Sequence, residues 1–135
     1  MSEVGEPFMR PRIFDASVLA VVAAGGAIGA VCRALLTWGF PGAGPVVILL
    51  INVVGCALMG ALIVVAEGRG RLLRPFLGTG VLGGFTTVST YAVTSVQLFT
   101  SAPAIGLVYL LATPLLAVLA ASAGFTLARR TGSVR

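Results

Sequence analysis

The stretch GTGVLGGFTTVSTY (residues 78–91) decides the fold of this chain, because it interrupts an apolar run long enough to cross a membrane. Residues 75–128 contain no Asp, Glu, Lys or Arg. Adjacent glycines are poor helix formers, and threonine hydroxyls compete for the backbone groups that a helix needs. The sequence therefore predicts a membrane-spanning helix that is broken at Gly83-Gly84-Phe85-Thr86-Thr87.

The composition excludes a soluble domain. Of 135 residues, 58% are hydrophobic and only 10% are charged, whereas soluble domains are about 25% charged. Apolar windows predict four spans, at residues 17–38, 45–66, 72–99 and 104–128. We expect an all-α integral membrane protein with four transmembrane helices, the third broken near its middle. Residues 1–16 and 129–135 are the expected tails, and residues 17–128 form one membrane domain.

The arginines predict the orientation in the membrane. The chain has no lysine, and its arginines adjoin the apolar segments instead of forming the basic face of a soluble nucleic-acid-binding domain. With four spans, eight arginines fall on one side and none in the two opposite loops: Arg10, Arg12, Arg69, Arg71, Arg74, Arg129, Arg130 and Arg135. This bias predicts that both termini are cytoplasmic, in the plasma or inner membrane, and that the chain inserts in one orientation only.

Two polar residues inside the spans have two interpretations each. Arg33 lies about one turn from the end of the first span, where it either snorkels to the interface or forms a fixed charge that attracts an anion. Asn52 either bonds one helix to another or donates its amide N–H to a passing anion.

The break in the third span also has two interpretations, a glycine kink for packing alone or part of a permeation path. A polar stripe continues beyond it at three- and four-residue steps, which favours a path: Thr87, Thr90, Thr94 and Gln97. Enzyme chemistry is not indicated, because the chain has no His and no paired carboxylates, and its Ser and Thr have no base to activate them.

Three motifs resemble those of the Fluc/CrcB family of fluoride channels. They are GGAIGA (residues 25–30) followed by Arg33, the Asn52-x-x-Gly55 step, and GGFTT-x-ST (residues 83–90), and the similarity covers residues 25–124. The resemblance implies an antiparallel dimer with two narrow pores that pass fluoride passively across the lipid bilayer.

The resemblance also implies roles for single residues. Asn52 matches a pore asparagine, Arg33 a vestibule arginine, and the carbonyls of Gly83 and Thr86 the ligands of a structural sodium ion at the dimer interface. Further residues complete the implied anion pathway: Thr90 of the polar stripe, Tyr109 and Thr113 of a polar track whose next position is Ala117, and the pore-edge positions Val88 and Tyr91.

Departures from the family pattern lead to a hypothesis about assembly. Val88 and Tyr91 stand where the family usually has Phe, and Thr94 stands where it has Glu. A homodimer of antiparallel subunits needs a chain that inserts both ways, which the arginine bias opposes. We therefore expect one half of a heterodimer with an inverted homologous subunit. A non-conducting structural subunit is the main alternative, and a small four-helix drug exporter is disfavoured because no glutamate lies in the membrane.

Overall fold

The computed structural model describes residues 15–132, which are almost entirely helical and contain no strand. Helix α1 (Ala16–Gly39) leads through the single turn η1 (Pro41–Ala43) into α2 (Gly44–Val65), and α5 (Pro103–Gly132) ends the described part. Three segments are long and apolar enough to cross a membrane: Ala16–Gly39, Pro41–Val65 and Pro103–Gly132. They coincide with three of the expected spans, although α5 continues past residue 128. The expectations for Arg10, Arg12 and Arg135 lie outside the described residues.

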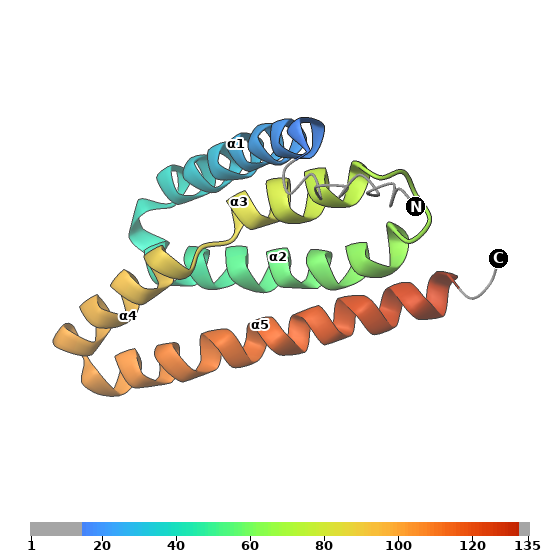
Figure 1. Ribbon diagram of the computed structural model, residues 1–135. Helices are drawn as coiled ribbons and strands as arrows, with labels where there is room; N and C mark the ends of the chain where they lie inside the picture. Colours follow the sequence, from blue (N-terminus) through green and yellow to red (C-terminus); the bar gives the residue numbers. More distant parts are fainter. Residues whose placement is uncertain (1–14, 133–135) are drawn as a thin grey trace, which may run out of the picture.

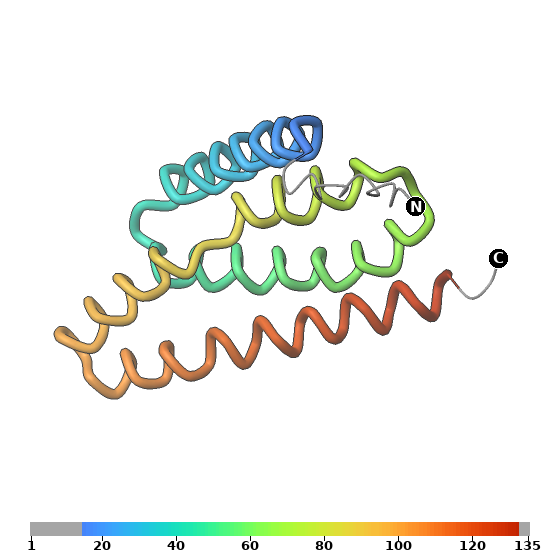
Figure 2. Tube along the Cα trace, viewed as in Figure 1, coloured from blue at the N-terminus to red at the C-terminus, as the bar shows by residue number. Residues whose placement is uncertain are grey.

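The remaining expected span, residues 72–99, is divided. It consists of η2 (Pro75–Leu82), which is π-helical, then α3 (Gly83–Phe85) and, after two extended residues, α4 (Val88–Ser101). Figure 2 shows the tube straightening between α3 and α4. A break in this region was expected, and the structure confirms it.

The residues that make the break are the threonines, not the glycines. Gly83 and Gly84 remain helical, whereas Thr86 has φ −74° and ψ 156° and Thr87 has φ −148° and ψ 120°. The Thr87 side chain accepts a hydrogen bond from the Thr90 N–H, as an N-cap does. The break therefore falls within the predicted stretch Gly83–Thr87, at its two threonines, and a capping threonine starts the new helix.

The glycines instead allow close contact between helices. A Cβ on Gly29 of α1 would lie 2.7 Å from the Phe85 backbone nitrogen, and a Cβ on Gly25 would lie 2.9 Å from that of Val81. Helix α1 therefore packs backbone to backbone against η2 and α3, as small residues permit in membranes. The contact of α2 with α5 is similar, since a Cβ on Gly60 would lie 3.0 Å from the Phe125 backbone nitrogen.

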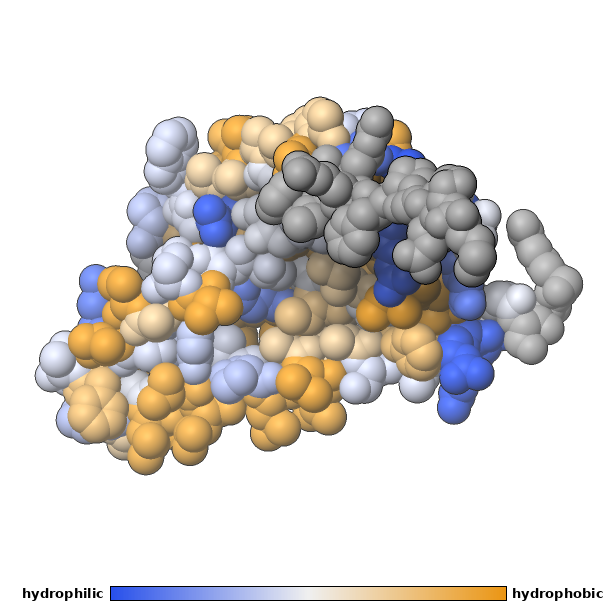
Figure 3. Space-filling view, in the orientation of Figure 1, coloured by the Kyte–Doolittle hydropathy of each residue, from blue (hydrophilic) through white to orange (hydrophobic). Residues whose placement is uncertain are grey.

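Successive long helices run in opposite directions, with α2 lying between the η2–α3 segment and α5 (Figure 1). The face shown in Figure 3 carries many apolar side chains, and large hydrophobic residues are exposed on every long helix; Trp38 is 79% exposed. Five arginines gather at the end of the bundle where α2 passes into η2 and where α5 finishes: Arg69, Arg71, Arg74, Arg129 and Arg130. At this end Arg71 forms an ion pair with Asp15, the N-cap of α1.

Candidate functional site: a broken helix beside a groove

Asn52 of α2 holds the break in place. Its Oδ1 accepts a hydrogen bond from the Thr87 N–H at 2.8 Å, and its Nδ2 donates to the Thr87 carbonyl at 3.0 Å. Asn52 is 8% exposed and Thr87 is 5% exposed. The amide therefore replaces the partner that the Thr87 N–H would have in an unbroken helix, and it adds a donor to the Thr87 carbonyl, which as an N-cap carbonyl also accepts the first bond of α4. Asn52 thus connects α2 to the break, and one of its two N–H groups takes no part in these two hydrogen bonds.

Arg33 contacts the same break from α1. Its Nη1 donates to the Thr86 carbonyl at 3.3 Å. Thr86 is the C-cap of α3, where the helix dipole favours a positive charge. Arg33 therefore does not simply snorkel to the interface, since its guanidinium is directed back at the interrupted helix.

A groove of about 340 Å³ opens beside the break, bordered by α2, α4 and α5. It brings together four of the expected anion-pathway residues: Asn52, Val88, Tyr91 and Thr113. Thr113 is 3% exposed, and its Oγ1 has no hydrogen-bond partner within the described part of the chain. The groove thus has a buried polar atom with unused hydrogen-bonding capacity. Ala117, where the expected polar track is interrupted, also lines it.

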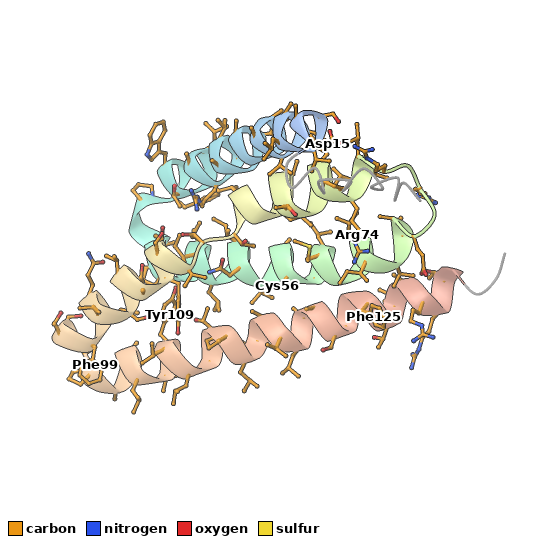
Figure 4. The ribbon with its side chains drawn as sticks, in the orientation of Figure 1. Asp15, Cys56, Arg74, Phe99, Tyr109 and Phe125 are labelled. Atoms are coloured by element: carbon orange, nitrogen blue, oxygen red, sulfur yellow. The ribbon has the colours of Figure 1, made fainter. Side chains whose placement is uncertain are left out.

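The two tyrosines form a pair across α4 and α5. Their ring centroids lie 5.8 Å apart. The Tyr91 hydroxyl donates to the Leu110 carbonyl at 2.5 Å, and the Tyr109 hydroxyl donates to the Pro45 carbonyl at 3.1 Å. Figure 4 labels Tyr109 in the space between α2 and α5.

Four of the expected site residues do not line this groove: Arg33, Gly83, Thr90 and Tyr109. The polar stripe is not uniform either. Thr94 is buried, whereas Thr90 and Gln97 are exposed, and the Thr90 hydroxyl accepts a hydrogen bond from the Thr87 hydroxyl at 3.0 Å. The stripe residues therefore face different surroundings in the folded chain.

The two carbonyls expected to bind sodium fit that role in part. The Thr87 N–H, which would bond Gly83 O in a continuous helix, is used by Asn52, so the Gly83 carbonyl lacks its helical partner. The Thr86 carbonyl accepts from Arg33, which brings a positive charge to one of the two expected ligands. Among residues 15–132 there is no cluster of His, Cys, Asp or Glu suited to a metal.

Sequence reasoning missed Cys56 and Val118, which line the groove, and two residues with a more specific role. Pro114 lines the groove from inside α5, and Leu110 supplies the carbonyl that Tyr91 binds. The signal for both was present, since a proline within a helix frees the carbonyl four residues earlier.

Comparisons with known proteins cover most of the chain. The family model described as "CrcB-like protein, Camphor Resistance (CrcB)" matches residues 20–125. The fluoride-specific ion channel FluC 1 of Streptomyces coelicolor is 51% identical over 123 residues, which are 86% of this chain and 80% of the relative. FluC 1 of Rhodococcus jostii is 49% identical over 114 residues, 83% of this chain and 86% of the relative. FluC 2 of Nocardia farcinica is 42% identical over 128 residues, which are 90% of this chain and 87% of the relative.

Proposed function

This chain belongs to the CrcB family, and from that premise we propose that it is a subunit of a fluoride-specific ion channel. The observation that carries the proposal is the helix break at Thr86 and Thr87, held by Asn52 beside a largely apolar groove that Asn52 and Thr113 also line. Non-helical backbone is tolerated at membrane depth only where protein covers it or where it lines a cavity. The relatives named as fluoride-specific channels supply the identity of the ion.

Neutral donors suit the passage of fluoride. The anion is small and strongly hydrated, so fixed N–H and O–H groups must replace its water. The remaining N–H of Asn52 and the unpartnered hydroxyl of Thr113 are the groove's candidates for such donors. No charged residue lines the groove, which keeps binding weak enough for release. Passive flow of this kind needs no reaction chemistry.

We propose that the broken segment η2–α3–α4 makes a fourth crossing of the bilayer and that the channel is an antiparallel dimer. The groove is open along one side, and Val88 at its edge is 80% exposed, which leaves room for a second subunit to complete a pore. The arginines at one end of the bundle favour a cytoplasmic location of that end in the cell membrane. Because this bias opposes dual insertion, the proposed partner is an inverted homologous subunit.

Fluoride efflux from liposomes tests function and assembly together. With the arginine bias in control of insertion, we expect little efflux from the purified chain alone and rapid efflux after co-expression with an inverted homologue from the same organism. A fluoride electrode measures release after valinomycin is added. Robust efflux from the chain alone would replace the heterodimer with a homodimer. Absence of efflux from both preparations would contradict the channel function.

A structural sodium ion remains a proposal supported by the family resemblance and by the free carbonyl of Gly83. The carbonyl oxygens of Gly83 and Thr86 of each subunit would be its ligands. The ion's positive charge would offset the negative ends of these carbonyl dipoles at the dimer interface. Arg33, which already donates to Thr86, would oppose a second cation there.

Arg33→Gln tests whether the charge of Arg33 weakens sodium binding at the Thr86 carbonyl. Loss of the charged donor is expected to destabilise the assembly by about 1 kcal/mol and to strengthen the stabilisation given by sodium. The measurement is the melting temperature in sodium chloride and in N-methylglucamine chloride of equal ionic strength. Arg33→Lys, which keeps the charge, is the control and should respond to sodium like the unaltered protein. If sodium raises the melting temperature of none of the three proteins, the sodium site is excluded.

A further inference from the structure

Pro114 leaves one backbone carbonyl of α5 without its helical partner. Proline has no N–H, so the carbonyl of Leu110, four residues earlier, loses the bond that a regular helix would make. Such a carbonyl is unfavourable within a bilayer unless a neighbouring group satisfies it. Here the satisfying group is the hydroxyl of Tyr91, which donates to Leu110 O at 2.5 Å.

Tyr91 belongs to α4, the second half of the broken helix. Its hydroxyl therefore ties the segment that follows the break to α5. Both Tyr91 and Pro114 line the groove that contains Asn52, and the Tyr91 ring also packs against Tyr109 with centroids 5.8 Å apart. The ring is thus fixed at two points, by a hydrogen bond at its tip and by an aromatic neighbour at its side.

We infer that Tyr91 is a positioning residue whose hydroxyl caps the carbonyl that Pro114 frees and so fixes the edge of its ring at the groove. The inference rests on the proposed function, because the ring edge is the electropositive part that an anion would pass. A phenylalanine at this position cannot make the bond. Tyr91 and Pro114 are therefore coupled across two helices: because Pro114 has no N–H, the Leu110 carbonyl depends on the Tyr91 hydroxyl.

A double-mutant cycle on stability tests the coupling. Tyr91→Phe should lower the folded-to-unfolded ratio by about threefold to tenfold, in the range measured for interhelical hydrogen bonds in membranes. Pro114→Ala restores an N–H for the Leu110 carbonyl, so in that background the same change should cost less than about twofold. Denaturant titration of the assembled protein in detergent micelles gives each ratio. Equal losses in the two backgrounds would overturn the inference.

Tyr109→Phe is the matched control. It also removes a tyrosine hydroxyl from the ring pair, but its acceptor, the Pro45 carbonyl, lies in α2 and owes nothing to Pro114. Its effect should be the same with and without Pro114→Ala. If Pro114→Ala does not fold, Tyr91→Phe and Tyr109→Phe are compared directly. Tyr91→Phe is then expected to be the more damaging, and an equal or smaller loss would count against the cap.

Fluoride efflux separates positioning from plain structural support. Tyr91→Phe and Pro114→Ala should each slow efflux several-fold, and the double variant should be no slower than either single one, because all three release the same ring. Coupled stability with unchanged efflux in every variant would refute the positioning role. If the unaltered assembly passes no fluoride, the proposed function fails, while the stability cycle still decides whether Tyr91 caps Leu110.

Discussion

Replacement of Asn52 by Ala is expected to lower fluoride efflux by at least about 100-fold. The change leaves the Thr87 N–H without a partner at a buried position and removes the side-chain donor to the Thr87 carbonyl. Each unsatisfied buried group costs about 1–3 kcal/mol, so the break should move or close, and the N–H proposed to meet the anion is removed at the same time. Efflux from liposomes at equal protein density measures the result, and tenfold in rate corresponds to about 1.4 kcal/mol.

Ser95→Ala is the control for Asn52→Ala. Ser95 is 4% exposed, and its hydroxyl donates to the Tyr91 carbonyl within α4, away from the break. Removing that bond should change efflux by less than about twofold, because the Tyr91 carbonyl keeps its helical partner. If Asn52→Ala leaves the efflux of the reconstituted pair unchanged, this chain's asparagine lines no conducting pore. The chain would then be the structural, non-conducting subunit.

Gly29→Ala is expected to prevent assembly of the native bundle. The added methyl carbon would overlap the Val81 carbonyl oxygen and would lie 2.7 Å from the Phe85 backbone nitrogen. Both neighbours are backbone atoms of helices, so relief requires α1 to separate from η2 and α3. We expect a loss of about 3 kcal/mol or more, seen as a lower melting temperature and as aggregation in size-exclusion chromatography.

Gly26→Ala supplies the matched control, three residues away on the same helix. A Cβ on Gly26 meets nothing within 4 Å, so the substitution should be neutral or slightly stabilising through better helix propensity. Equal tolerance of the two changes would contradict the backbone-to-backbone packing described for α1. If Gly29→Ala is damaging and Gly26→Ala is not, Gly29 of the GGAIGA motif (residues 25–30) serves helix packing.

Asn52 illustrates how far the sequence predicts the site. Its place inside an apolar run marks it as functional or structural, but the sequence left its partner open. The partner is the backbone of Thr87, 35 positions away. Thr113 was identified only through the family resemblance, and its unpartnered hydroxyl became visible once α2, α4 and α5 were packed together.

The sequence by itself determined the three apolar helices long enough to cross a membrane, the interruption of the segment at residues 72–99 and the gathering of arginines at one end. Hydropathy, charge and local backbone preference act within a few neighbouring residues, so they can be deduced from the chain in order. Only the tertiary structure decided that Thr86 and Thr87 carry the break, that the glycines serve helix contact, and that Tyr91 satisfies the carbonyl freed by Pro114. These outcomes depend on which buried polar group meets which partner across helices, and that pairing is set by packing between distant segments.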